Sequence, residues 1–234
     1  MNWEAFFTTL FPAITTLVAG YYGARYGAER GADRAYELQR TKESDEIKRR
    51  NIAKGNIAIF NILMMANTLE NYQRQNIDPI RNSQTAFLDL RPTLPIESGA
   101  KLNIETLGFL LETDDPNLLG FIAAEKEKFQ TILRAINERA RCYKNEVQPL
   151  LEKAGIFQGR TVTLNEIWNA IGDRLYATLE KSTEDVISLV DDYIKSHKEV
   201  ADRLTTCLKK LHPGEKIIGL AKPGPTEDAV KKAN

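Results

Sequence analysis

Apolar and polar positions are unevenly distributed along the chain, and the first block is the most apolar. Residues 5–24 (AFFTTLFPAITTLVAGYYGA) contain no charged side chain, and a helix needs about 20 such residues to cross roughly 30 Å of hydrocarbon. A secretory signal peptide would begin with basic residues, whereas only Glu4 precedes this block. We therefore predict a transmembrane helix. A buried or interfacial helix is the alternative, because threonines and Pro12 dilute the hydrophobicity.

The predicted span has two unlike faces when its residues are placed at about 100° intervals. Small and hydroxyl residues gather on one side and continue beyond the span with a four-residue repeat. This face consists of Thr8, Thr9, Pro12, Thr15, Thr16, Ala19, Gly20, Gly23, Ala24, Gly27 and Gly31. Small residues allow close helix approach in a membrane, so we predict the seam of a homo-oligomer. A threonine-lined ring would instead form an aqueous pore, and threonines bonded to their own helix would make the pattern incidental.

The distribution of Lys and Arg predicts the orientation. No Lys or Arg precedes the span, and those that follow are Arg25, Arg30, Arg34, Arg40, Lys42, Lys48, Arg49, Arg50 and Lys54. Positive residues stay on the cytoplasmic side, which predicts a cell inner-membrane protein with its N-terminus outside and its C-terminus cytoplasmic. Acidic residues are interleaved, and the i,i+4 pairs Arg25–Glu29 and Glu46–Arg50 are typical of a solvated helix rather than a polybasic lipid patch.

The rest of the chain has helical periodicity almost throughout. Residues 57–66 are apolar but too short to span a membrane, so we predict a core helix there. Two long amphipathic patterns follow, about 116–153 and 164–211. The expected helix boundaries and breaks are an N-cap at Asp115-Pro116, a stop at Gly155, a capping box at Thr163/Glu166, a kink or new N-cap at Ser182-Thr183, and an end at His212-Pro213-Gly214.

These patterns predict an all-α fold, in which a single N-terminal transmembrane helix precedes an up-down bundle of three or four long, coiled-coil-like helices. The expected segments are an anchor (1–24), a charged helical stalk (25–56), the bundle (57–212) and a flexible tail (213–234). Within the bundle, residues 76–103 carry several prolines and form a long loop. Such a loop has either a partner-binding or gating role or is a surface connection.

Candidate chemistry is sparse. The 32 basic and 32 acidic residues balance, which argues against electrostatic capture of nucleic acid. Cys142 and Cys207 lack metal-ligand spacing and are expected to be free thiols, most simply small buried residues. We expect His197 on the surface, His212 at a helix C-terminus, Asp114-Asp115 as a cap and Asp191-Asp192 on a solvated face. No hydrolase, nucleotide-binding or metal motif is found in the sequence, so we expect no enzyme, catalytic residue, cofactor or metal site.

The residues therefore predict a self-associating membrane protein whose cytoplasmic domain is an interaction or sensing module, with membrane lipid and a cytoplasmic protein as partners. A soluble protein with a buried first helix is a further alternative. The order of a short outer N-terminus, one span and long cytoplasmic helices resembles small anchored helical proteins found beside bacterial anti-phage systems, including accessory membrane proteins of RNA-targeting CRISPR loci. That resemblance implies a second function: an antiviral membrane effector that permeabilises or perturbs the bilayer.

Overall fold

The computed structural model describes the backbone of residues 3–157 and 161–219, and the side chains of these residues from Thr15 onward except Leu17. The chain is all-α, 80% helical, and no strand occurs in these ranges. Long helices pack as a bundle, so the predicted fold class is confirmed. The first helix, α1 (Trp3–Tyr72), contributes to two compact units, Met1–Arg50 and Asn51–Asn234.

In the first unit, the described side chains are exposed from Thr15 to Arg50, except that of Lys48, which is half-buried. Local pairs support this part of α1. The Arg25 guanidinium lies 3.2 Å from the Glu29 carboxylate, and that of Arg50 lies 3.7 Å from Glu46. Both predicted i,i+4 pairs are therefore present. Each contributes only about 0.2–0.5 kcal/mol to helix stability.

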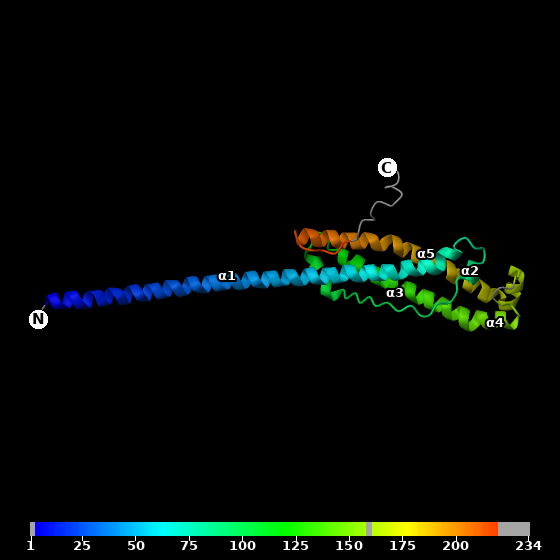
Figure 1. Cartoon of the computed structure of the whole chain (residues 1–234), viewed down its shortest axis with the longest axis horizontal. Helices are drawn as coiled ribbons and strands as arrows, with labels where there is room; N and C mark the ends of the chain where they lie inside the picture. The colour runs from blue at the N-terminus through cyan, green and yellow to red at the C-terminus, as the bar shows by residue number, and fades with distance from the viewer. Residues whose placement is uncertain (1–2, 158–160, 220–234) are drawn as a thin grey trace, which may run out of the picture. The chain divides into compact units, whose positions relative to one another are not determined.

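The second unit contains the remaining elements. They are η1 (Gln73–Ile77), η2 (Asp78–Ile80), α2 (Ala86–Asp89), η3 (Glu105–Glu112), α3 (Leu118–Cys142), η4 (Tyr143–Val147), α4 (Gln148–Lys153) and α5 (Leu164–Leu211). Figure 1 shows α3 and α5 lying along the part of α1 that belongs to this unit, drawn in cyan. Three long helical segments thus build the bundle.

Contact pairs give the directions of these helices. At α1 and the η1 residue that follows it, Gly55 contacts Leu208 and Gln73 contacts Asp191 of α5. At α3 and the residues just before it, Arg139 contacts Thr183 and Asp115 contacts Arg203 of α5. In both sets one residue number rises as the other falls, so α5 is antiparallel to α1 and to α3. The helices α1 and α3 are consequently parallel, and residues 73–117 form the crossover between them. The all-α bundle is confirmed, but the predicted up-down order is wrong for this pair, because a long crossover and not a short turn joins them.

The bundle has a large core and a small second core. The large core joins α1, α3 and α5 through buried side chains that include Ile59, Ile62, Leu69, Ile122, Phe129, Ile132, Val186, Val190, Leu204 and Leu208. The second core consists of Phe87, Val147, Leu151, Ile167, Ile171 and Leu179. It lies where α2, η4, α4 and the beginning of α5 meet. Burial of apolar stripes, rather than local propensity, stabilises most helices in proteins.

The predicted loop at 76–103 is packed against the bundle. Its Phe87, Leu90 and Leu102 (just before η3) are buried. Two side chains from the long helices hold its backbone: Arg139 donates to the carbonyl oxygen of Phe87 (2.8 Å), and Asn61 Oδ1 accepts from the amide of Lys101 (2.7 Å). The segment therefore packs against the long helices along much of its length.

Local sequence signals set several helix ends correctly. Thr163 and Glu166 form the predicted capping box at the start of α5. Gly155 has a φ of 71° immediately after α4, a left-handed conformation that glycine adopts without steric penalty. The end of α5 at Leu211, with His212 as its C-cap, also agrees with the prediction. These signals act over a few residues and depend little on tertiary packing.

Two predicted boundaries are wrong. The helix α3 begins at Leu118 with Asn117 as its N-cap, because the Asp115 carboxylate binds Arg203 at 2.7 Å instead of capping the helix. The break in α5 lies at Gly172 (φ 76°, ψ 161°) and not at Ser182-Thr183. Thr183 is buried inside the regular helix, where its hydroxyl donates to the carbonyl oxygen of Leu179.

One helix near the N-terminus is long and apolar enough, by length and composition, to cross a membrane. It is the described stretch Val18–Ile80, and 44% of its apolar window is buried in the fold. No described side chain before Asn51 is buried, so this buried share belongs to the bundle core, around Ile59 and Ile62. The core helix predicted at 57–66 is thereby confirmed. The separate span predicted at 5–24 falls mostly on side chains outside the described residues.

The close approach of α1 and α5 at Gly55 gives a first prediction. A Cβ atom there would lie 2.5 Å from Cδ1 of the fully buried Leu208. We expect Gly55→Ala to lower the free energy of unfolding by about 1–3 kcal/mol, because the core must shift to admit the methyl group. Chemical denaturation of the full-length protein measures this change.

The matched control is Gly120→Ala in α3, where an added Cβ meets nothing within 4 Å. Alanine there should stabilise the protein by up to about 1 kcal/mol through helix propensity. Equal effects of the two substitutions would contradict the close approach at Gly55.

Candidate functional site

The predicted oligomerisation face lies on α1. Thr15, Thr16, Ala19 and Ala24 are exposed, whereas the side chains of Thr8, Thr9 and Pro12 lie outside the described residues. The four glycines of this face are Gly20, Gly23, Gly27 and Gly31. A Cβ atom added at any of these glycines would meet no atom of its own chain within 4 Å. The face is therefore sterically open within one chain, and its role as a seam stays a prediction.

Large side chains beside this face are also uncovered. Val18 is 49% exposed, Tyr21 65% and Tyr26 61%. Tyr26 contacts the guanidinium of Arg30, whose Cζ lies 4.9 Å above its ring. Within the described part of the first unit, apolar and aromatic surface thus faces outward on a helix without tertiary packing. Such a surface is typical of an interaction site.

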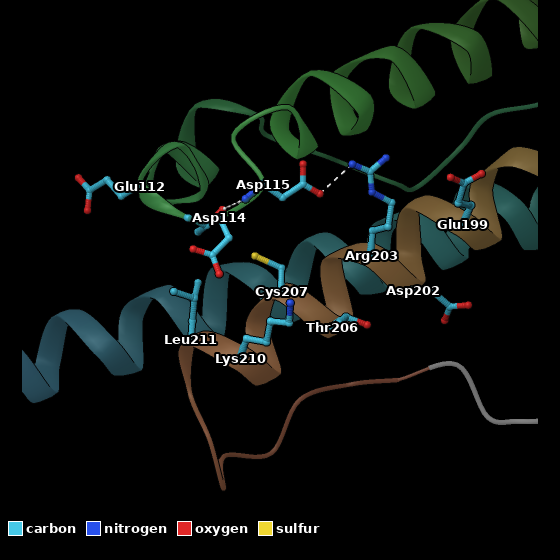
Figure 2. A pocket seen from close by; sticks show the side chains of 11 residues that line it. Glu112, Asp114, Asp115, Glu199, Asp202, Arg203, Thr206, Cys207, Lys210 and Leu211 are labelled. Atoms are coloured by element: carbon cyan, nitrogen blue, oxygen red, sulfur yellow. Dashed lines mark hydrogen bonds and ion pairs between the residues drawn. The ribbon is translucent and has the colours of Figure 1, made fainter.

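A concave site of about 450 Å³ lies between the η3–α3 connection and α5. Figure 2 shows its carboxylates, which come from Glu112, Asp114, Asp115, Glu199 and Asp202. Only Arg203 and Lys210 oppose them, and Arg203 is bound to Asp115. The cleft is therefore electronegative. No group of three or more His, Cys, Asp or Glu side chains in the described ranges could hold a metal ion.

The two cysteines are free and half-buried. Cys207 lines the acidic cleft, while Cys142 ends α3. Burial, reinforced by the carboxylate of Glu146, raises the pKa of the Cys142 thiol. Since the thiolate is the reactive form, Cys142 is a poor nucleophile at neutral pH. This agrees with the predicted structural role of that residue.

A buried polar network inside the bundle was not predicted from the sequence. The Glu125 carboxylate is almost fully buried on α3, where it accepts from the Ser196 hydroxyl (2.9 Å) and the Lys128 ammonium (2.7 Å). Buried charges persist when they are paired and hydrogen-bonded. Ser196 is 71 positions away in the chain, so no local pattern reveals the pair. The network fixes the register of α3 against α5.

The prediction that His197 lies on the surface is wrong, since only 1% of it is exposed. Its ring stacks on Tyr193 with centroids 5.6 Å apart, and Nδ1 lies 3.1 Å from the Tyr193 carbonyl oxygen. The four-residue step from Tyr193 places His197 on the buried face of α5. That spacing was available in the sequence, but the polar neighbours Ser196 and Lys198 obscured it.

The prediction of a solvated face at Asp191-Asp192 is wrong for the first residue. The Asp191 carboxylate accepts from both terminal nitrogens of Arg81, at 2.7 and 2.9 Å, and from Gln73 at 2.7 Å. The Arg81 hydrogen bonds, supported by Gln73, hold the pKa of Asp191 below its usual value. Asp192 remains exposed as expected. This pairing fastens the end of α1 and the crossover to α5.

Arg139 is a second buried charge that sequence reasoning missed. It donates to the Thr183 hydroxyl (2.9 Å) and to the Phe87 carbonyl oxygen, and burial lowers the pKa of its guanidinium. Its partners lie 44 and 52 positions away. Arg139 therefore joins α3, α5 and α2, and its role is structural.

Comparisons with known proteins supply no further assignment, because no protein family, curated protein or solved structure matches the chain.

The burial of His197 generates a prediction for pH. Burial lowers the pKa of His197 from its ordinary 6.5, against the opposing effects of the Tyr193 carbonyl and the Glu70 and Glu125 carboxylates; Lys198 acts with burial. The unfolded chain therefore takes up this proton first as pH falls. The free energy of unfolding of the parent protein should decline below about pH 6.5. The free energy of unfolding of the His197→Gln variant should decline less over the same range.

Chemical denaturation of the parent and of His197→Gln at about pH 7.5 and about pH 5.5 gives the loss of unfolding free energy in each protein. Carboxylate titration contributes equally to both losses, so their difference reports His197. An identical pH response of His197→Gln and the parent would contradict the assignment.

Proposed function

We propose that this protein is a single-pass inner-membrane protein that self-associates through α1 and carries a cytoplasmic helical bundle as an interaction or sensing module. The observation that carries the proposal is the uncovered first unit. Its described side chains face outward, including Val18 and several tyrosines. A helix without packing has only weak local pairs to stabilise it, so lipid or other copies of the chain would supply the missing contacts.

Membrane insertion is supported by residues 5–24, which lack charge and match the length of a span. Tyr21, Tyr22 and Tyr26 follow at the end of this block, where aromatic side chains favour a membrane interface. Their exposure leaves them available for that role. The Lys and Arg residues that begin at Arg25 would remain in the cytoplasm, which places the bundle there as well.

Self-association is supported by the small face of α1. Glycine lowers helix stability by about 1 kcal/mol relative to alanine, so Gly20, Gly23, Gly27 and Gly31 weaken the helix that contains them. No close contact within the chain explains the presence of these glycines, because a Cβ atom added at any of them would meet nothing within 4 Å. Close packing between copies would supply that contact, because small residues let helix backbones approach.

The bundle would present its surfaces to the cytoplasm. Its large core depends on α1, α3 and α5 of one chain, and no described side chain before Asn51 belongs to it. The proposed role of the bundle therefore does not require the anchors to change its fold. Assembly of the anchors would instead bring several bundles together, which raises their effective concentration toward a shared partner.

Substitution of the glycine face tests self-association. Gly23→Leu/Gly27→Leu adds two side chains at positions where a Cβ atom meets nothing within 4 Å and raises helix propensity. Loss of the oligomer would therefore report a lost contact between copies and not a lost helix. We expect a multimer for the parent protein and a monomer for this variant, measured as detergent-corrected mass by light scattering.

The matched control is Val18→Leu/Tyr22→Leu, which introduces the same side chains on the opposite face and should keep the parent mass. Ion flux through liposomes containing each protein tests the effector alternative in the same samples. Equal masses for the parent and both variants would contradict assembly through the glycine face.

A further inference from the structure

The small second core is open to solvent on one side. The opening is a pocket of about 620 Å³ bounded by η2, α2, η4, α4 and the first turn of α5. Two residues of the second core, Leu151 and Ile167, form part of its wall. Ligand pockets in proteins span about 300–1,000 Å³, so the pocket has room for a small organic molecule.

Apolar and polar surface each make up about half of this wall. Ile80, Leu88, Ile156 and Val162 line the pocket, and the last three also pack against the second core. Phe157 lies at the edge with 62% of its surface exposed. Six buried side chains make a small core, and an apolar group in this pocket would extend it and remove further surface from water.

The pocket contains one carboxylate, Asp89, and one guanidinium, Arg91, of which only Arg91 can pair with an anion. The Asp89 carboxylate accepts through Oδ2 from the hydroxyls of Ser83 (2.6 Å) and Thr85 (2.8 Å), which hold it in place. The Arg91 guanidinium lines the same pocket and makes no ion pair or hydrogen bond with the residues described, 3–157 and 161–219. A guanidinium binds a carboxylate through two parallel hydrogen bonds.

Tyr143 adds a neutral donor. It lines the pocket from η4, and burial raises the pKa of its phenol above the usual 10.0. The hydroxyl therefore keeps its proton at neutral pH and donates to an acceptor. Its ring also provides an aromatic wall that faces the same opening as Phe157. A cation, a phenol donor and an apolar wall thus converge on one cavity.

We propose that this pocket binds a small organic carboxylate with a compact apolar or aromatic body. The carboxylate pairs with Arg91 and accepts from Tyr143, and the body occupies the apolar wall beside Leu88 and Phe157. This binding site does not depend on membrane anchoring or self-association. The proposed pocket and the proposed anchor can therefore be tested separately.

The test uses 2-naphthoate and its neutral isostere 2-naphthamide, which differ in charge and not in the apolar body. Equilibrium dialysis of the full-length protein in detergent micelles, against empty micelles at the same concentration, removes the contribution of the micelle and can be carried out whether or not α1 enters a membrane. We expect saturable binding with one naphthoate per chain and weaker binding of the amide. Naphthoate should also raise the unfolding temperature, because it binds only the folded state.

Variants locate the site. Arg91→Gln should weaken naphthoate binding by about tenfold or more, the range for a charged hydrogen bond, and leave the amide unchanged. Phe157→Ala, at an exposed position, should weaken both compounds. Arg134→Gln is the matched control, since this arginine is also exposed and lies outside the pocket.

Three results would overturn the proposal: no saturable binding of naphthoate, equal affinity for the acid and the amide, or equal effects of Arg91→Gln and Arg134→Gln. A normal unfolding temperature of each variant without ligand establishes that lost binding does not arise from lost folding. Failure here would leave the oligomer mass of the glycine-face variants unaffected.

Discussion

The packing of α5 between α1 and α3 is the interaction on which the rest of the structure depends. Its buried stripe, which includes Val190, Leu204 and Leu208, removes apolar surface from both neighbours at once. Polar contacts then fix the register: Ser196 binds Glu125 of α3, and Asp191 binds Arg81, which follows η2. Nothing equivalent covers the described part of α1 before Arg50. The described side chains of α1 are therefore uncovered before Arg50 and buried in a core after it, and this contrast supports the proposed anchor.

The fold class could be predicted because it depends on periodicity. The stripes of α3 and α5, the capping box at Thr163 and the glycine stop at Gly155 are all signals within a few residues. Predictions failed where a distant partner decided the outcome. Asp115 resembles an N-cap in sequence but binds Arg203, 88 positions away. The break at Gly172 rather than at Ser182 shows that backbone conformation outweighed the hydroxyl residues, which are accommodated inside the helix.

The sites were less predictable than the fold. The glycine face of α1 was visible in the sequence because it repeats every four residues, whereas the pocket beside Arg91 is assembled from segments between Gln75 and Ile167. Neither Arg91 nor Tyr143 carries a local motif. Their significance comes from the crossover at 73–117, which brings α2 against α4 and α5, and this connection is held by the buried Arg139. The contacts of Arg139 join residues that are far apart in the chain, so they could not be predicted from one sequence.

Flotation of full-length protein with liposomes tests the central claim, the membrane anchor, most directly. The comparison is with residues 25–234, which retain the complete core of the second unit. We expect the full-length chain to float with the lipid and to resist extraction by carbonate, whereas the shortened chain stays in the dense fraction as a soluble protein. A full-length chain that remains soluble and does not float would contradict the anchor and assign residues 5–24 to a helix outside the membrane.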